Sequence, residues 1–414
     1  MDERTQKIMA SRAKTAARRA TQELRVRELK IATSSLNKTK LEKLNLIFLE
    51  AKWLRNSIVA EGVFDYKLSQ HGIHVRLPDG TIEARQLTVL PAHVKQTIQL
   101  GLQANVKALA SVKKAGRIAG AIRFTDRVNS LEFPTGDVKV SGKKAFIPKI
   151  GWVRVSGTQQ LGNEIANARL VRRASGYYLL VASLSPKSEA AEPDLEPIGL
   201  DFGIKTHITT SDNREWNLTV EEPERLKRLQ RKLSRQVKGS NNYEKTRRLI
   251  QLSYERLNHR KDEAASQFVA SLKRHSLIAL QDENLRGWKT QKRRGYSRAI
   301  QYSAMGRVKA KLQRLPQTVV VDRFAPTTQL CPECGSLNKM PLSERIYKCD
   351  CGYSEQRDVH AAQNVLMLAQ LGSHPKSSPR GPGVVPVEGR TSAASSASGK
   401  STTVKQEMVF AVSS

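Results

Sequence analysis

The sequence predicts a multidomain protein of the α+β and α/β classes. Its N-terminal half is strand-rich and encloses helices, and its C-terminal half alternates strands and helices. Three observations support this prediction: two apolar runs lead into acidic residues, all four cysteines fall within one short stretch, and 414 residues suffice for roughly two to four domains.

The first part of the chain has the pattern of a strand followed by helices. Residues 1–22 are basic and alanine-rich, which predicts a basic arm that is poorly ordered or ordered by RNA. Residues 24–32 alternate like a strand, and residues 40–59 carry the apolar spacing of an amphipathic helix. A second helix is expected over residues 92–115.

Strands and turns are expected from residue 117 to residue 184, ending in a hairpin with Ser175 and Gly176 at its turn. Residues 23–184 therefore predict a strand-rich module that encloses a helical one at about 38–116. The stretch SPKSEAAEPDLEP, residues 185–197, has the composition of a linker.

The C-terminal half predicts strand, hairpin, helices, strand, helix, strand, cysteine-rich segment and helix. Two long helices are expected over residues 221–275, with a break near 238–242, and a strand over 316–322. Residues 372–414 are rich in Ser, Pro, Gly and Ala without periodicity, which predicts a disordered tail.

Three separate acidic residues have settings that suit a divalent metal. Asp201 and Glu283 follow the apolar runs IGL and LIAL, which predict buried strands, and Asp358 opens a predicted helix. Magnesium prefers carboxylate oxygens held in well-defined positions. Each acid alone also has a structural interpretation: Asp201 as a turn former, Glu283 as a surface residue and Asp358 as a helix N-cap.

The four cysteines form the pattern C-x2-C, fourteen residues, C-x-C, and each pair is followed by a glycine. Cys331, Cys334, Cys349 and Cys351 can thus turn four thiolates toward one zinc ion. The first twenty residues contain no apolar segment typical of a secretion signal, so zinc is favoured over disulfides. Four thiolates leave no open position on the metal, which predicts one structural Zn²⁺.

The stretches GLDFGIK, LQDENLRG, TTQLCPECG and LSERIYKCDCGYSEQRDVHAAQNVL resemble the RuvC-type nuclease domain of the TnpB family. TnpB proteins are transposon-encoded, RNA-guided DNA nucleases, and the miniature type V CRISPR effectors resemble this chain equally. The resemblance implies a catalytic triad of Asp201, Glu283 and Asp358 that binds two Mg²⁺ ions.

The same resemblance implies a domain order. It suggests a β-barrel wedge domain over residues 23–184, interrupted by a helical recognition domain. A RuvC-like, RNase H-like nuclease would follow, with its first part at 198–326, an inserted zinc ribbon at 327–355 and a final helix at 356–371.

The charge of the chain predicts a polyanionic partner. Lysine and arginine number 70 against 38 acidic residues, giving a formal charge of +32 and a pI near 10.2. The resemblance implies guide RNA and double-stranded target DNA as partners, and no membrane-length apolar run is present. The expected nucleic-acid contacts are Lys113, Lys114, Arg117, Lys205, Arg231, Arg235, Lys289, Arg293, Arg294 and Arg357.

The sequence leaves several alternatives open. The first hypothesis is a magnesium-dependent, RNA-guided DNA endonuclease of the TnpB type, and a miniature CRISPR effector is the alternative within it. A repressor that binds DNA through a guide RNA without cutting is the alternative from another class, although such a protein would be free to lose the acids. The chain is expected to act in the prokaryotic cytoplasm or nucleoid, as a monomer or homodimer.

Overall fold

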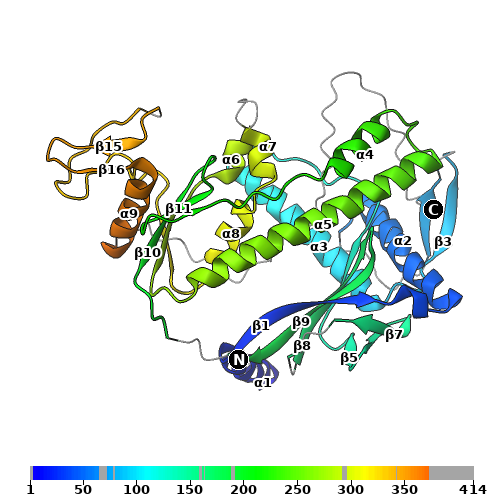
Figure 1. Cartoon of the computed structure of the whole chain (residues 1–414). Helices are drawn as coiled ribbons and strands as arrows, with labels where there is room; N and C mark the ends of the chain where they lie inside the picture. The colour runs from blue at the N-terminus through cyan, green and yellow to red at the C-terminus, as the bar shows by residue number, and fades with distance from the viewer. Residues whose placement is uncertain are drawn as a thin grey trace. The chain divides into compact units, whose positions relative to one another are not determined.

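A computed structural model describes residues 3–64, 72–77, 80–157, 161–162, 164–187, 192–290, 296–341 and 343–372 (Figure 1). The chain divides into two compact units, one within residues 1–188 and the other within residues 189–393. The predicted tail beyond residue 372 lies outside the described residues. No helix of the described part is both long and apolar enough to cross a membrane.

The first unit is built on a seven-stranded antiparallel sheet with the order β4-β8-β9-β1-β7-β6-β5. Its strands are β1 (Gln22–Ile31), β4 (Ser130–Phe133), β5 (Lys139–Ser141), β6 (Lys144–Ile147), β7 (Gly151–Ser156), β8 (Glu164–Arg173) and β9 (Gly176–Pro186). The expected hairpin joins β8 to β9, and its Gly176 has a φ of 130°, which glycine adopts readily.

This sheet curls but is not a barrel closed by hydrogen bonds among the described strands. The pairing runs from β4 at one edge to β5 at the other. Strand β1 pairs with β9 along most of its length but with β7 only through Lys30 and Ile31, so the sheet bends where β1 ends. The predicted barrel is therefore observed as a curled open sheet (Figure 1).

The predicted helical insertion lies between β1 and β4 of this sheet. It begins with a 3-10 turn (Thr33–Ser35) and contains α2 (Lys38–Glu61), the hairpin β2 (Gly72–Arg76) and β3 (Ile82–Gln86), and α3 (Ala92–Lys114). The Asn37 side chain caps α2 by accepting a hydrogen bond from the Lys40 amide at 2.9 Å.

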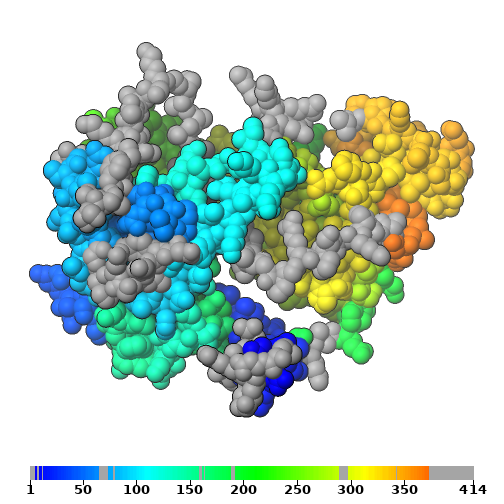
Figure 2. Space-filling model, turned by 180° about the vertical axis from the view of Figure 1, so that it is seen from behind, coloured from blue at the N-terminus to red at the C-terminus, as the bar shows by residue number. Residues whose placement is uncertain are grey.

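The fully buried Glu50 of α2 holds the segment of residues 88–90, which leads into α3. Its carboxylate accepts hydrogen bonds from the backbone amides of Thr88, Val89 and Leu90 at 2.7–3.0 Å. These amides satisfy a charge that would otherwise be expensive to bury. Much of α3 remains at the surface (Figure 2).

Two expectations for the first unit were wrong. The basic arm is a regular helix, α1 (Glu3–Ala20), because this stretch lacks glycine and proline and is rich in good helix formers. No strand forms between residues 117 and 129. There the backbone of Thr125 bonds the Asn56 side chain in both directions, at 2.9 and 3.0 Å, instead of a neighbouring strand.

The second unit contains a five-stranded mixed sheet with the order β12-β11-β10-β13-β14. The strands are β10 (Ile198–Phe202), β11 (Ile208–Thr210), β12 (Glu215–Trp216), β13 (Ile278–Gln281) and β14 (Thr318–Val321). Strands β10, β13 and β14 run parallel, while β11 and β12 continue the sheet antiparallel.

Helices cover both faces of this sheet (Figure 1). On one face, α5 (Asn241–Leu272) and α8 (Met305–Leu312) pack against Leu200 and Leu280. On the other face, α9 (Arg357–Gln370) packs against Ala279. Neighbouring residues of β13 thus enter different cores, as the two-residue period of a strand requires.

The remaining elements follow the predicted order. Helix α4 (Glu224–Ser234) and α5 form the expected helical pair, and their break spans residues 235–240. Helices α6 (Leu285–Thr290) and α7 (Tyr296–Gln301) precede α8. The cysteine-rich segment carries the small hairpin β15 (Ile346–Lys348) and β16 (Ser354–Gln356), which leads directly into α9.

Candidate active site and cysteine cluster

Asp201 and Glu283 lie at the same end of the second unit's sheet. Asp201 is the fourth residue of β10, and the parallel register pairs Leu200 with Leu280 of β13. Glu283 follows the last residue of β13, Gln281, by two positions. Since the two strands are parallel neighbours, their carboxyl ends open on the same side, where sites commonly form in α/β sheets.

Helix α9 brings Asp358 to this end of the sheet through a close approach to Gly199 in β10. A Cβ atom at Gly199 would lie only 2.1 Å from the carbonyl oxygen of Ala362. Asp201 lies two residues after Gly199 along β10, and Asp358 lies four residues, or about one helical turn, before Ala362 along α9. Each of these separations is about 6 Å along its element. The two carboxylates therefore reach the same level, and we call Asp201, Glu283 and Asp358 together the carboxylate site.

The electrostatics of Asp201 show that the three acids are neighbours. Burial, followed by the negative charges of Asp358 and Glu283, raises the pKa of Asp201 to about 7. Burial also raises the pKa of Glu283, against the opposing charges of Lys309 and Arg323. The three acids are not gathered as tightly as the cysteines, which alone among the described residues place three or more ligand atoms within 4.8 Å of one another.

The neighbouring acid Asp282 has a different environment. Its carboxylate accepts hydrogen bonds from Lys309 at 2.8 Å and from Arg323 at 2.5 Å, and both bonds lower its pKa. Lys309 also donates to the backbone carbonyl of Glu283 at 2.6 Å. Asp282 is thus occupied by two cations, whereas no ion pair engages the Glu283 carboxylate among the described residues. Sequence reasoning missed this pairing, because its partners lie 27 and 41 residues away.

Asp358 is not the N-cap of α9, so that interpretation was wrong. The N-cap is Gln356, and Asp358 is the second residue of the helix. There its charge is stabilised by the helix dipole and by Arg357, whose Nε lies 3.2 Å from Asp358 Oδ1. Arg345 adds a weaker interaction at 3.9 Å.

The expected nucleic-acid contacts lie on several elements. Lys113 and Lys114 end α3, and Arg117 follows it; all three are exposed. Lys205 is exposed in the loop between β10 and β11.

The others fall around the second unit's helices. Arg231 is exposed on α4, and Arg235 is exposed at its C-cap. Lys289 belongs to α6, while Arg293 and Arg294 lie outside the described residues. Arg357 differs from the exposed residues, because it is half-buried and bonds Asp358 and the Glu344 carbonyl.

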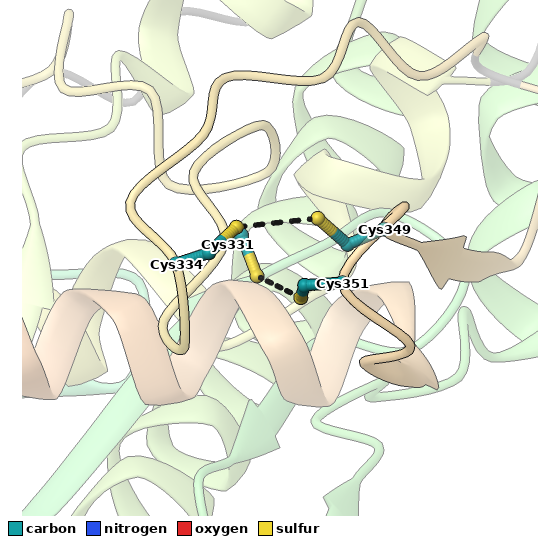
Figure 3. Close-up of side chains that lie close together, drawn as sticks. All are labelled: Cys331, Cys334, Cys349 and Cys351. Carbon is teal, nitrogen blue, oxygen red and sulfur yellow. Dashed lines mark hydrogen bonds between the residues drawn. The ribbon is translucent and has the colours of Figure 1, made fainter.

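The four cysteines converge as their spacing predicts (Figure 3). Cys331 Sγ lies 3.7 Å from Cys351 Sγ, and Cys334 Sγ lies 3.5 Å from Cys349 Sγ. Zinc–sulfur bonds of about 2.3 Å in a tetrahedron place sulfurs about 3.8 Å apart, so the cluster could bind zinc. Without a metal the four thiols titrate together: hydrogen bonding to Ser336 lowers the pKa of Cys334 to about 6, while the neighbouring cysteines raise the pKa of Cys351 to about 12.

A buried polar clamp joins the cysteine cluster to α9. Asn364 Nδ2 donates to the carbonyls of Thr327 and Leu330, each at 2.7 Å. His360 Nε2 lies 2.7 Å from the same Leu330 carbonyl, and its ring stacks on Tyr347 with centroids 3.9 Å apart. Leu330 directly precedes Cys331, so the cysteine cluster and the helix that carries Asp358 are held together. The motif DVHAAQN contains these residues, but its spacing did not reveal their partners.

Two family models match parts of this chain. Residues 304–365 match the Cas12f1-like TNB domain, and residues 180–290 match a family described as a probable transposase. The matches include Asp201, Glu283, Asp358 and all four cysteines.

Similar proteins carry related names. The chain is 28% identical over 264 residues to "Putative RNA-guided DNA endonuclease InsQ" of Escherichia coli K12, covering 58% of this chain and 65% of that protein. It is 31% identical over 186 residues to a "Putative RNA-guided DNA endonuclease" of Streptomyces pristinaespiralis, covering 42% and 46%. The chain thus spans about half to two thirds of the length of these relatives.

The cryo-EM structure of a Cas12f1-sgRNA-target DNA complex aligns with 83% of this chain and 99% of that chain. Its sequence identity is 12% and its TM-score is 0.41, which is too low to support a conclusion. The family models and the names of the relatives agree with the resemblance that the motifs indicated.

Proposed function

We propose that this chain is an RNA-guided, magnesium-dependent DNA endonuclease of the TnpB type. The observation that carries the proposal is the carboxylate site, where the charges of Glu283 and Asp358 help to raise the pKa of Asp201 to about 7. Three acids held together against their mutual repulsion favour a divalent cation. The names of the relatives support the same activity.

The donor set of the carboxylate site suits magnesium. It offers oxygen ligands only, at the carboxyl end of two parallel strands and the first turn of a helix. Asp201 and Asp358 would hold two Mg²⁺ ions between them, and Glu283 would complete the site. When bound, the ions would activate a water and stabilise the leaving oxygen in phosphodiester hydrolysis.

The residues around the site have distinct roles in this proposal. Lys309 bonds both Asp282 and the Glu283 carbonyl, which positions the backbone that carries the Glu283 carboxylate. Arg357 limits the negative charge around Asp358 until a cation is bound. Neither Lys309 nor Arg357 can itself be a metal ligand in place of a carboxylate, because both side chains offer only hydrogen-bond donors.

The cysteine cluster would hold one structural Zn²⁺ through Cys331, Cys334, Cys349 and Cys351. Four thiolates fill the tetrahedral positions and leave none for substrate. Through Leu330 and the clamp of His360 and Asn364, the ion would stabilise the position of α9. Its contribution to the activity is therefore indirect.

Guide RNA and double-stranded target DNA are the proposed partners. The formal charge of +32 supports binding to a polyanion, and base pairing would read the sequence while the protein binds the backbone. The curled sheet with its helical insertion would be the wedge and recognition domains, and the mixed sheet would be the RuvC-like nuclease. We propose that the exposed lysines and arginines of α3 and α4 contact phosphates, and that the protein acts in the prokaryotic cytoplasm or nucleoid as a monomer or homodimer.

The carboxylate site is tested by single substitutions in the full chain. Asp201→Ala, Glu283→Ala or Asp358→Ala should each abolish plasmid cleavage while guide-dependent DNA binding remains. Asp126→Ala is the matched control, because Asp126 is an acid of the first unit whose side chain is 92% exposed. Full cutting by the Asp201→Ala protein would reject the site. If the unmodified protein binds its target and never cuts, the repressor alternative is favoured.

The guide is tested separately. Replacing the guide segment of the bound RNA should redirect cutting to the matching DNA, and cutting that continues at the old site would reject RNA guidance. Sequencing the copurified RNA separates a transposon-encoded nuclease from a CRISPR effector, because the two would carry transposon-end RNA and repeat-derived RNA.

A further inference from the structure

The most exposed aromatic side chain among the described residues belongs to Phe324, at 86% exposure. Aromatic residues make up only 5% of the chain. The other described aromatic side chains of the second unit are buried or half-buried, and Phe202 at 5%, Phe268 at 2% and Tyr347 at 1% are among the buried ones. A phenylalanine that is 86% exposed contributes little to folding through burial.

The turn that carries Phe324 is fixed by hydrogen bonds. The Phe324 amide donates to Asp322 Oδ1 at 2.7 Å. The buried Gln281 donates from Nε2 to the carbonyls of Asp322 and Ala325, each at 3.0 Å, and its Oε1 accepts from the Thr327 hydroxyl at 3.1 Å. The ring is therefore held outward by a defined turn, and its exposure does not result from a frayed strand end.

This turn lies beside the carboxylate site. Strand β14 runs parallel to β13 with Val321 opposite Gln281, so residues 322–325 leave the sheet at the same end as Glu283. Arg323, the residue before Phe324, donates to Asp282 at 2.5 Å, and its charge acts on the pKa of Glu283. Phe324 thus belongs to a turn at the end of the sheet that carries Glu283, and the residue before it contacts Asp282.

The surroundings of Phe324 favour a nucleobase over a protein surface. Protein docking sites are contiguous apolar patches, whereas the residues before Phe324 are Asp322 and the half-exposed Arg323. Proteins that bind single-stranded nucleic acid combine basic side chains with exposed aromatic rings on which bases stack. Phe324 supplies such a ring, while Arg323 itself is paired with Asp282.

We propose that Phe324 stacks on an unpaired base of the DNA strand that enters the carboxylate site. The stack would fix the strand beside the scissile phosphate without reading its sequence, because every base presents an aromatic face. This inference rests on the proposed function, since it requires a DNA strand at the site. It adds a substrate-binding residue that lies outside the acidic triad and the cysteine cluster.

The test uses the full chain with its copurified RNA and a target whose cut strand carries 2-aminopurine near the cleavage position. Stacking on Phe324 should change the fluorescence of the base when the strand enters the site. Phe324→Leu keeps an apolar side chain but removes the ring, and it should raise the strand concentration needed for half-maximal binding by about 5- to 150-fold. Phe324→Tyr should retain near-normal binding.

Leu337→Ala is the control, because Leu337 is 61% exposed on the cysteine-rich segment and has no proposed role. If Phe324→Leu binds, cuts and changes fluorescence like the unmodified protein while Asp201→Ala does not cut, the stacking inference alone is overturned. Equal losses in Phe324→Leu and Phe324→Tyr would also overturn it. If the unmodified protein neither binds nor cuts DNA, the proposed function fails and the inference fails with it.

Discussion

Gly199→Ala is a small change that should disturb the carboxylate site without touching any of its acids. The new Cβ would lie 2.1 Å from the Ala362 carbonyl oxygen and 2.9 Å from Leu366 Cβ. Ordinary contacts begin near 3.4 Å, so the carbonyl must retreat by about 1.3 Å. Strand β10 cannot move in its place, because it is bonded between β11 and β13 and the Gly199 amide donates to Ser211 Oγ at 3.0 Å. Helix α9 must therefore shift and displace Asp358.

The expected magnitudes follow from this shift. Forcing an added methyl group into a packed interior lowers the unfolding free energy by about 1–3 kcal/mol. A displacement of about 1 Å in a catalytic group lowers rates by about 100-fold. Gly199→Ala should therefore remain folded but cut target DNA about 100-fold more slowly.

The assay is single-turnover cleavage of target DNA, together with thermal unfolding of the same preparations. Gly306→Ala is the matched control, because Gly306 lies in α8 and a Cβ there meets no atom within 4 Å. The control should cut normally and unfold at the same or a slightly higher temperature. Normal cutting and unchanged unfolding of Gly199→Ala would refute the packing argument that aligns Asp358 with Asp201.

Two further predictions concern the charge of Asp201 and the cysteine cluster. The pKa of Asp201 in the folded protein is about 7, above its ordinary value of 3.8, so the folded state retains a proton that the unfolded state has lost between these pH values. Without added magnesium, the unfolding free energy should therefore fall as the pH rises from about 4 to 7. Asp201→Asn should remove the part of this fall that Asp201 causes. Identical pH profiles of the unfolding free energy for the two proteins would contradict the raised pKa of Asp201. Cys331→Ser should reduce bound zinc and also cleavage, because a structural zinc ion supplies about 10–16 kcal/mol of apparent binding free energy and Leu330 links the cluster to α9. Metal analysis should find one zinc per unmodified chain, and active protein with less than half an equivalent would exclude the structural ion.

The sequence by itself determined the elements and their order in the second unit. The apolar runs before Asp201 and Glu283 form neighbouring parallel strands, and the helix expected after Asp358 is present, beginning at Arg357. The four cysteines also meet as their spacing predicts. These features are local: apolar periodicity, glycine turns and short ligand spacings are contained within a few residues.

Only the tertiary structure decided how the acids relate to one another. Asp282 and Glu283 are adjacent acids in the sequence, and only distant Lys309 and Arg323 distinguish them by pairing with Asp282. Asp358 reaches the level of Asp201 because α9 packs closely on Gly199. Such contacts join residues far apart in the chain, so no short pattern records them. The helical α1 and the open, curled sheet differ from the sequence expectations for a related reason: helix propensity outweighed charge in the arm, and limited pairing between β1 and β7 bends the sheet.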